Sequence, residues 1–147
     1  MISDIYDAML AACETALPNY DVLANPYIPE ENANNLFDKA FGIAFGPGLN
    51  ENRIACPKIS INRSIDLVLI NKVTSSESNT NFLGQQQKDI FEDLFAIIKT
   101  VYADNTLNEI CSKFDYSSDA GLEFLDAVQG KYYLLSATFP ILYFDNI

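Results

Sequence analysis

Residues 131–145, KYYLLSATFPILYFD, are the stretch that decides the fold. Apolar side chains recur at every second position from Tyr133 to Tyr143, which is the period of a β-strand. The positions between them are also largely apolar and hold Tyr132, Leu134, Leu142 and Phe144. This stretch therefore predicts a long strand with apolar side chains on both of its faces.

Two further strands are predicted upstream of this one. Residues 59–67 alternate between apolar and polar side chains except at Arg63, and residues 67–70 are apolar at every position, which indicates an end covered on both faces. Residues 41–45, FGIAF, alternate in the same way. The Gly46-Pro47-Gly48 that follows predicts a turn that ends the strand.

Two helices are predicted from periods of three and four residues. Ser3 is a suitable N-cap for a helix over residues 4–16, and Pro18 ends the pattern. A longer helix is predicted over residues 83–103, where a wide apolar stripe faces the core. The stripe consists of Ile90, Phe91, Leu94, Phe95, Ile97, Ile98, Val101 and Tyr102.

The order of these segments predicts the fold class. It reads helix, strand, strand, helix, a short strand at 113–116 and the long last strand, with residues 117–130 as a connection. We expect an α+β fold, with an antiparallel or mixed sheet of about four strands and the two main helices packed on one face. A length of 147 residues fits a single domain over residues 1–147.

The charge of the chain excludes tight binding to nucleic acid. Twenty acidic residues face nine basic ones, for a net charge of −11, whereas phosphate binding depends on clustered Lys and Arg. An acidic wall would still suit a channel through which DNA slides without sticking. Nothing at the N-terminus resembles a secretion signal, and no apolar run is long enough to span a bilayer, so we expect assembly in the cytoplasm and no membrane partner.

Catalytic and metal chemistry find little support in the composition. The chain has no histidine, and Cys13, Cys56 and Cys111 match no zinc or redox spacing, so they read as buried thiols. Neighbouring carboxylates are expected by chance in so acidic a chain, and a calcium loop at 115–123, DYSSDAGLE, has the wrong length and glycine position. We therefore predict no enzyme, no cofactor, no metal and no catalytic residues.

Surplus apolar surface points instead to protein interfaces. Arg63 is the unusual polar residue, because strict alternation places it on the apolar side of its strand. Either the strand is twisted there and the guanidinium reaches water, or Arg63 forms an ion pair between subunits. The candidate interface residues are Tyr27, Ile28, Arg63, Phe82, Leu83 and Phe124.

Several short motifs carry a resemblance to a known family. They are FGIAFGPG at 41–48, NENR at 50–53, SINR at 60–63 with IDLVL at 65–69, YSSD at 116–119 and GKY at 130–132. With the order of the segments, they resemble the tail terminator, or tail completion, proteins of long-tailed bacteriophages.

The resemblance implies an α+β virion protein of the phage tail and neck. Such proteins form hexameric rings that end the growth of the tail tube and join the tail to the head. The implied partners are other copies of the chain, the tail tube protein, the head completion or connector protein, and duplex DNA passing through the lumen. An alternative is a monomeric acidic inhibitor or immunity-type protein that binds a basic partner surface, and a small hydrolase using carboxylates alone is a third class.

Overall fold

The computed structural model describes residues 2–23, 38–55, 58–73, 84–103, 111, 113–127 and 130–146. It confirms the α+β class, with two helices and one curled, mixed sheet. The elements in chain order are α1 (Ile2–Ala16), β1 (Asp21–Val22), β2 (Lys39–Ala55), β3 (Lys58–Lys72), α2 (Gln85–Ala103), β4 (Lys113–Phe114), β5 (Ser118–Ala127) and β6 (Gly130–Asn146).

The sheet has six strands where about four were predicted. Its order is β1-β2-β3-β6-β4, and β5 also pairs with β6. All neighbours are antiparallel except β1 and β2. The short strand predicted at 113–116 is present as β4, so the two additional strands are β1 and β5. β1 is two residues long, and a strand this short leaves no periodic signal in a sequence.

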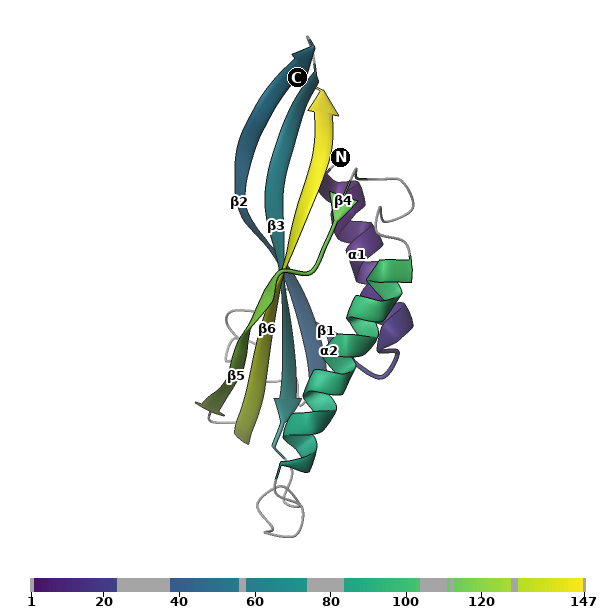
Figure 1. The fold of residues 1–147 in the computed structure, drawn as a ribbon. Helices are drawn as coiled ribbons and strands as arrows, with labels where there is room; N and C mark the ends of the chain where they lie inside the picture. Colours follow the sequence, from purple (N-terminus) through teal and green to yellow (C-terminus); the bar gives the residue numbers. More distant parts are fainter. Residues whose placement is uncertain are drawn as a thin grey trace.

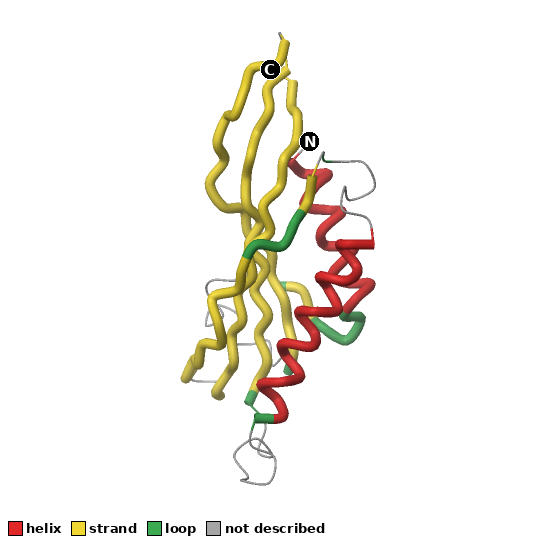
Figure 2. Tube along the Cα trace, in the orientation of Figure 1, coloured by secondary structure: helices red, strands yellow, loops and turns green. Residues whose placement is uncertain are grey.

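Both predicted helices are present and form one layer on a single face of the sheet (Figures 1 and 2). The predicted ends of each helix lie within two residues of the observed ones. On α1, Ile5, Met9 and Cys13 are buried, and their spacing of four residues places them on one face of the helix. The layer explains why the two-residue period of β6 is so regular, since every second side chain of β6 faces the helices.

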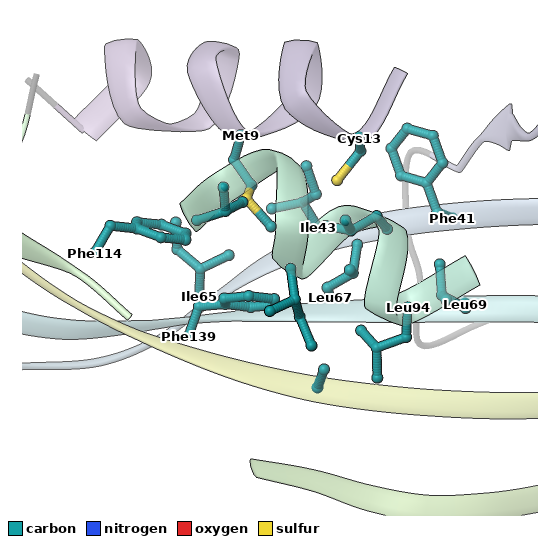
Figure 3. Packing of buried hydrophobic residues seen from close by; sticks show 14 of the residues in the cluster. Met9, Cys13, Phe41, Ile43, Ile65, Leu67, Leu69, Leu94, Phe114 and Phe139 are labelled. Carbon is teal, nitrogen blue, oxygen red and sulfur yellow. The ribbon is translucent and has the colours of Figure 1, made fainter. Parts of the chain in front are cut away.

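The main core lies between the helices and this face of the sheet (Figure 3). Met9 and Cys13 of α1 and Leu94 of α2 point down onto Ile65, Leu67 and Leu69 of β3. Phe114 and Phe139 stack at one end, with ring centroids 5.5 Å apart. A full-sized apolar side chain contributes about 1.5–3 kcal/mol when buried, so the many buried side chains of this layer make a large stabilising contribution.

The predicted turn at Gly46-Pro47-Gly48 was wrong, because β2 continues through it to Ala55. The register against β3 shifts between Phe45 and Gly48, so a β-bulge absorbs the extra residues. Pro47 is tolerated there because the bulge interrupts the hydrogen-bond ladder, so the missing N–H of a proline costs no ladder bond.

The predicted connection at 117–130 was also wrong over most of its length, because Ser118–Ala127 forms β5. This strand pairs antiparallel with β6, and its register shifts between Asp119 and Leu122. Gly121 lies in this irregularity with a φ of 77°, a conformation that suits glycine. The shift breaks the two-residue alternation, which hid the strand from a reading of the sequence.

The face of the sheet opposite the helices carries a smaller cluster of buried side chains: Leu23, Ala40, Val68, Ile70 and Tyr132. Both faces of the lower part of β3 are therefore buried, as the apolar run at 67–70 predicted. The upper ends of β2, β3 and β6 extend beyond the helices (Figure 1). Among the described helices, none has the length and apolar character needed to cross a membrane.

Candidate functional site

Two of the six candidate interface residues lie in the described part of the chain. Arg63 lies on β3, and Phe124 lies on β5. Tyr27, Ile28, Phe82 and Leu83 lie outside the described residues. The structure does not bring Arg63 and Phe124 together, because β6 lies between β3 and β5 in the sheet.

Arg63 faces the helix side of the sheet but is not simply directed into water. Its Nε donates a hydrogen bond to the Tyr143 hydroxyl at 3.2 Å, and NH1 donates to the carbonyl oxygen of Gly46 at 3.0 Å. A Cβ atom on Gly48 would lie 2.4 Å from NH2 of Arg63, so only a glycine leaves room for the guanidinium there. The side chain therefore lies across the bulge of β2.

Among the described strands, only β1 pairs with the outer side of β2. Within the described residues, β1 pairs with β2 only at Ala40 and Phe41. Two apolar side chains are exposed beside this edge: Val22 is 46% exposed, and Phe45 is 37% exposed although it packs on Tyr6 at 5.9 Å. We call Val22, Phe45 and the outer edge of β2 the β2 flank.

The side of α2 that faces β5 is aromatic and exposed. Gln87 Nε2 lies 3.5 Å from the hydroxyl of Tyr133, the residue on which Phe124 packs with ring centroids 6.3 Å apart. Phe91 and Phe95 follow Gln87 at steps of four and lie on the same side of the helix. Phe95 is 55% exposed and Phe124 58%. We call Phe91, Phe95, Tyr102 and Phe124 the α2–β5 flank.

This flank corrects the predicted stripe of α2, which was too wide. Ile90, Leu94, Ile97, Ile98 and Val101 are buried as predicted, whereas Phe91, Phe95 and Tyr102 are exposed. The three exposed residues lie at one border of the stripe on a helical wheel, and the sheet lies under the centre of the stripe. Lys99 covers part of Phe95, with Nζ 4.9 Å from the ring centroid.

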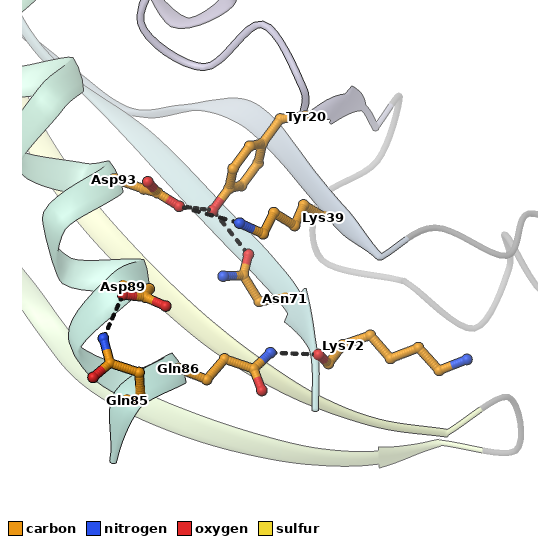
Figure 4. A network of polar contacts seen from close by, with 8 residues as sticks. All are labelled: Tyr20, Lys39, Asn71, Lys72, Gln85, Gln86, Asp89 and Asp93. Atoms are coloured by element: carbon orange, nitrogen blue, oxygen red, sulfur yellow. Dashed lines mark hydrogen bonds and ion pairs between the residues drawn. The ribbon is translucent and has the colours of Figure 1, made fainter. Parts of the chain in front are cut away.

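The opposite side of α2 is fixed by a polar network (Figure 4). The Tyr20 hydroxyl donates to Asp93 Oδ2 at 2.6 Å and also lies 2.9 Å from Asn71 Oδ1. Lys39 Nζ lies 4.0 Å from the same carboxylate. Burial, together with the hydrogen bond to Asp93, raises the pKa of the Tyr20 hydroxyl well above its ordinary value. A phenol that keeps its proton acts here as a structural tie between α2 and β3.

Cys13 lies in the core between the helices and the sheet, where it is not placed for covalent chemistry. Burial raises the pKa of the Cys13 thiol to about 12, so it is not a nucleophile at neutral pH. No group of three or more Cys, Asp or Glu side chains within the described ranges is placed to hold a metal ion. In the segment considered for calcium, Asp119 instead accepts hydrogen bonds from the Gly121 N–H and the Tyr116 hydroxyl, both at 2.9 Å.

Asp115 in the same segment is also held by its own neighbours. It accepts a hydrogen bond from the Tyr102 hydroxyl at 2.6 Å and another from the Tyr116 N–H at 2.9 Å, and these bonds lower the pKa of its carboxyl group. The contact fixes the end of α2 against the chain that leads into β5. These carboxylates thus stabilise the fold around the α2–β5 flank.

Sequence reasoning singled out Arg63 and Phe124 but missed the residues that surround them. Gly46 and Gly48 were predicted to form a turn. The position of Arg63 on the apolar side of the next strand was the signal that could have shown otherwise, because so large a side chain needs space, and glycines on the neighbouring strand provide it. Comparison of the sequence with protein-family models and with curated proteins finds no match.

Proposed function

We propose that this protein is a structural component of a phage tail that assembles into a ring at the head-proximal end of the tail tube. There it ends the growth of the tube and joins it to the head connector, and DNA passes through the lumen. The observation that carries the proposal is the division of the exposed apolar residues between two different flanks. The β2 flank and the α2–β5 flank lie at opposite edges of the same sheet.

Two different flanks favour a ring over a simple dimer. A two-fold dimer uses the same patch on both subunits, whereas a head-to-tail contact joins two unlike patches and closes into a ring when the rotation allows it. A chain with apolar side chains on both edges, here Phe45 on one and Phe95 with Phe124 on the other, has the surfaces that a head-to-tail contact needs.

The charge of the chain supports the passage of DNA. A net charge of −11 on each copy makes a ring strongly acidic, and such a ring has no means of displacing the counterions of a duplex. The same charge makes free copies repel one another, so moderate salt should favour assembly by screening charges beyond about 8 Å.

The rival function, an acidic binder of a basic partner, is supported by one feature. The charged side chains of β5 are Asp119, Glu123 and Asp126, which are all acidic and all exposed. A monomer could present this strand to a basic protein. Its apolar flanks would then remain uncovered, which is why we favour the ring.

The test is the oligomeric state of the purified protein. Native mass spectrometry and sedimentation over a range of protein and salt concentrations should show a closed homo-oligomer of six copies, and purified tail tubes should bind it at one end. Phe124→Ser should abolish assembly, whereas Phe144→Ser, an exposed aromatic outside both flanks, should leave it intact. A protein that stays monomeric throughout and does not bind tubes would contradict the proposal.

A further inference from the structure

The strand registers join the two edges of the sheet at one level. A single row of directly paired residues crosses five strands, through Val22, Phe41, Leu69, Leu135 and Leu122. Residues paired in this way point to the same face of a sheet, and the three inner residues of the row belong to the core under the helices. Val22 on β1 and Leu122 on β5 therefore end one apolar row, on the face that carries the helices.

Both ends of this row are accessible. Val22 is 46% exposed. At the opposite edge, Leu122 is half-buried, and Phe124, the next residue of β5 on the same face, is 58% exposed. A contact that joins two unlike edges of identical copies needs apolar surface on each edge at matching levels, and these residues provide it.

The strand directions also allow the two ends to meet. β1 runs parallel to β2, whereas β2, β3, β6 and β5 each run antiparallel to the next, so β1 and β5 point in opposite directions. Rotation about an axis along the strands keeps every residue at its own level. It therefore brings Val22 of one copy beside Leu122 and Phe124 of the next, with the two edge strands antiparallel.

In the helix layer, the start of α1 and the end of α2 share a second level. Tyr6 of α1 packs on Phe45, which is level with Phe139 of β6 across β3. Tyr102 of α2 donates to Asp115, whose N–H donates to the carbonyl oxygen of the residue after Phe139. The same rotation therefore brings the start of α1 in one copy to the level of the end of α2 in the next.

The exposed charges at this second level are complementary. Asp7 follows Tyr6 on α1 and is exposed. Lys99 is exposed on α2, one turn before Tyr102, and its Nζ lies over the ring of Phe95 on the side of α2 that faces β5. A carboxylate and an ammonium group thus lie on the two surfaces that the rotation brings together.

We infer that copies of this chain join edge to edge, with Val22 of one copy packed against Leu122 and Phe124 of the next. The inference rests on the proposed ring and names the residues of its subunit contact. The pair of Lys99 and Asp7 in the helix layer fixes which edge meets which.

One pair of charges opposes this contact. Asp21 and Glu123 end the neighbouring row, which runs through Asp21, Ala40, Ile70, Leu134 and Glu123 on the other face of the sheet. Both carboxylates are exposed, so the contact brings two like charges together. Free copies therefore associate weakly at low salt, and salt strengthens the contact by screening this pair.

Cysteine cross-linking tests the matching of levels directly. Val22→Cys combined with Leu122→Cys, in a Cys56→Ser background, should give disulfide-linked ladders up to the size of the ring on non-reducing gels. Within one copy the two sites lie four strand spacings apart, about 19 Å along the sheet, so a disulfide between them must join two copies. The native thiols Cys13 and Cys111 are buried and do not compete.

The matched control moves one cysteine along the same strand. Val22→Cys combined with Asp126→Cys places the second thiol on the same face of β5 and at an exposed site, four residues or about 13 Å from Leu122. This pair should not form ladders. Circular dichroism melting curves must show that every variant is folded.

A gain of affinity provides a second test. Asp21→Lys turns the opposing pair into an attractive one, so the concentration at half-assembly, measured by sedimentation at low salt, should fall by about fivefold or more. Adding Glu123→Lys places two lysines together and should remove this gain. Adding Asp126→Lys instead gives the same net charge and should keep the gain, because Asp126 lies three residues away from the pair.

Each failure has a distinct meaning. If the wild type forms rings but Val22→Cys links no better to Leu122→Cys than to Asp126→Cys, the assigned contact is wrong while the ring stands. If Asp21→Lys gives no gain, or if Glu123→Lys and Asp126→Lys affect it equally, the contact is again overturned. A wild type that never assembles overturns the proposed function and the contact together.

Discussion

The two halves of β3 differ in what surrounds them. In the lower half, residues 65–71, every side chain except that of Asp66 is buried, with helices on one face and a second apolar cluster on the other. In the upper half, residues 59–64, only Ser60 is buried, and Arg63 crosses toward the outer edge of β2. One strand thus holds the core together at one end and presents a charge at the other.

Within this one strand, the residues that stabilise the core and the residue that carries a charge to the sheet edge lie at opposite ends. Losses of side-chain volume should matter in the lower half, where the packing on both faces prevents relaxation. Losses of side-chain volume should matter less in the upper half, where the side chains are largely half-buried or exposed.

The largest expected effect comes from truncating matched aliphatic residues in the two halves. Leu67→Ala should lower the free energy of unfolding by about 3 kcal/mol or more, because the fully buried site leaves a cavity. Ile61→Ala, on the same face of the same strand but only half buried, should cost about half as much. Urea denaturation of both variants measures the contrast, and equal losses would show that the halves do not differ.

An intermediate effect is expected in alkaline solution, and it originates on the lower, helix-covered side. Burial raises the pKa of Cys13 from an ordinary 9.0 to about 12. Between these values the unfolded chain loses the thiol proton and the native protein keeps it. Stability should therefore fall as pH rises above 9, by about 1.4 kcal/mol for each pH unit.

Tyr20 adds to the alkaline loss above pH 10, because its pKa is also raised in the folded protein. The measurement is the free energy of unfolding at pH values from 8 to 11. Cys13→Ala serves as the control, since it should flatten the dependence between pH 9 and 10 whatever it costs at neutral pH. An unchanged slope in this variant would show that Cys13 is not the titrating group.

The smallest effect is expected in the upper half at the bulge. Gly48→Ala forces the far end of the Arg63 side chain to move, but the flexible arginine gives way, so the free energy of unfolding should change by less than about 1 kcal/mol. Thermal melting measures this change. A large loss of stability would mean that the bulge supports the fold and is not mainly a place where Arg63 is presented.

Much of the fold could be predicted from periodicity. The alternation in β6 and β3 and the buried faces of α1 and α2 are strong signals because one face of each element packs on a single core. The missed features are those where local irregularity breaks the period. The bulge at Gly46–Gly48 looks like a turn, and the shift at Gly121 disguises β5, because tertiary pairing compensates for poor local signals there.

The candidate site was predictable only in part. Arg63 was noticed because its place in the alternation was wrong for an arginine, yet its contact with Gly46 and Gly48 depends on the register between two strands. Phe95 looked like a core residue because hydrophobicity alone does not tell which border of a helical stripe the sheet leaves uncovered.

The pairing of β3 with β6 also has a consequence for folding kinetics. Two of the strand pairs, β2 with β3 and β5 with β6, are close in the chain and can form as hairpins. The pairing of β3 with β6 instead joins residues as distant in the sequence as Lys58 and Asn146. Closing so long a loop is slow, with times on the order of milliseconds to seconds for folds dominated by such contacts. We therefore expect docking of the two hairpins along β3 and β6 to set the folding rate, and until it occurs each hairpin exposes an apolar face that can aggregate.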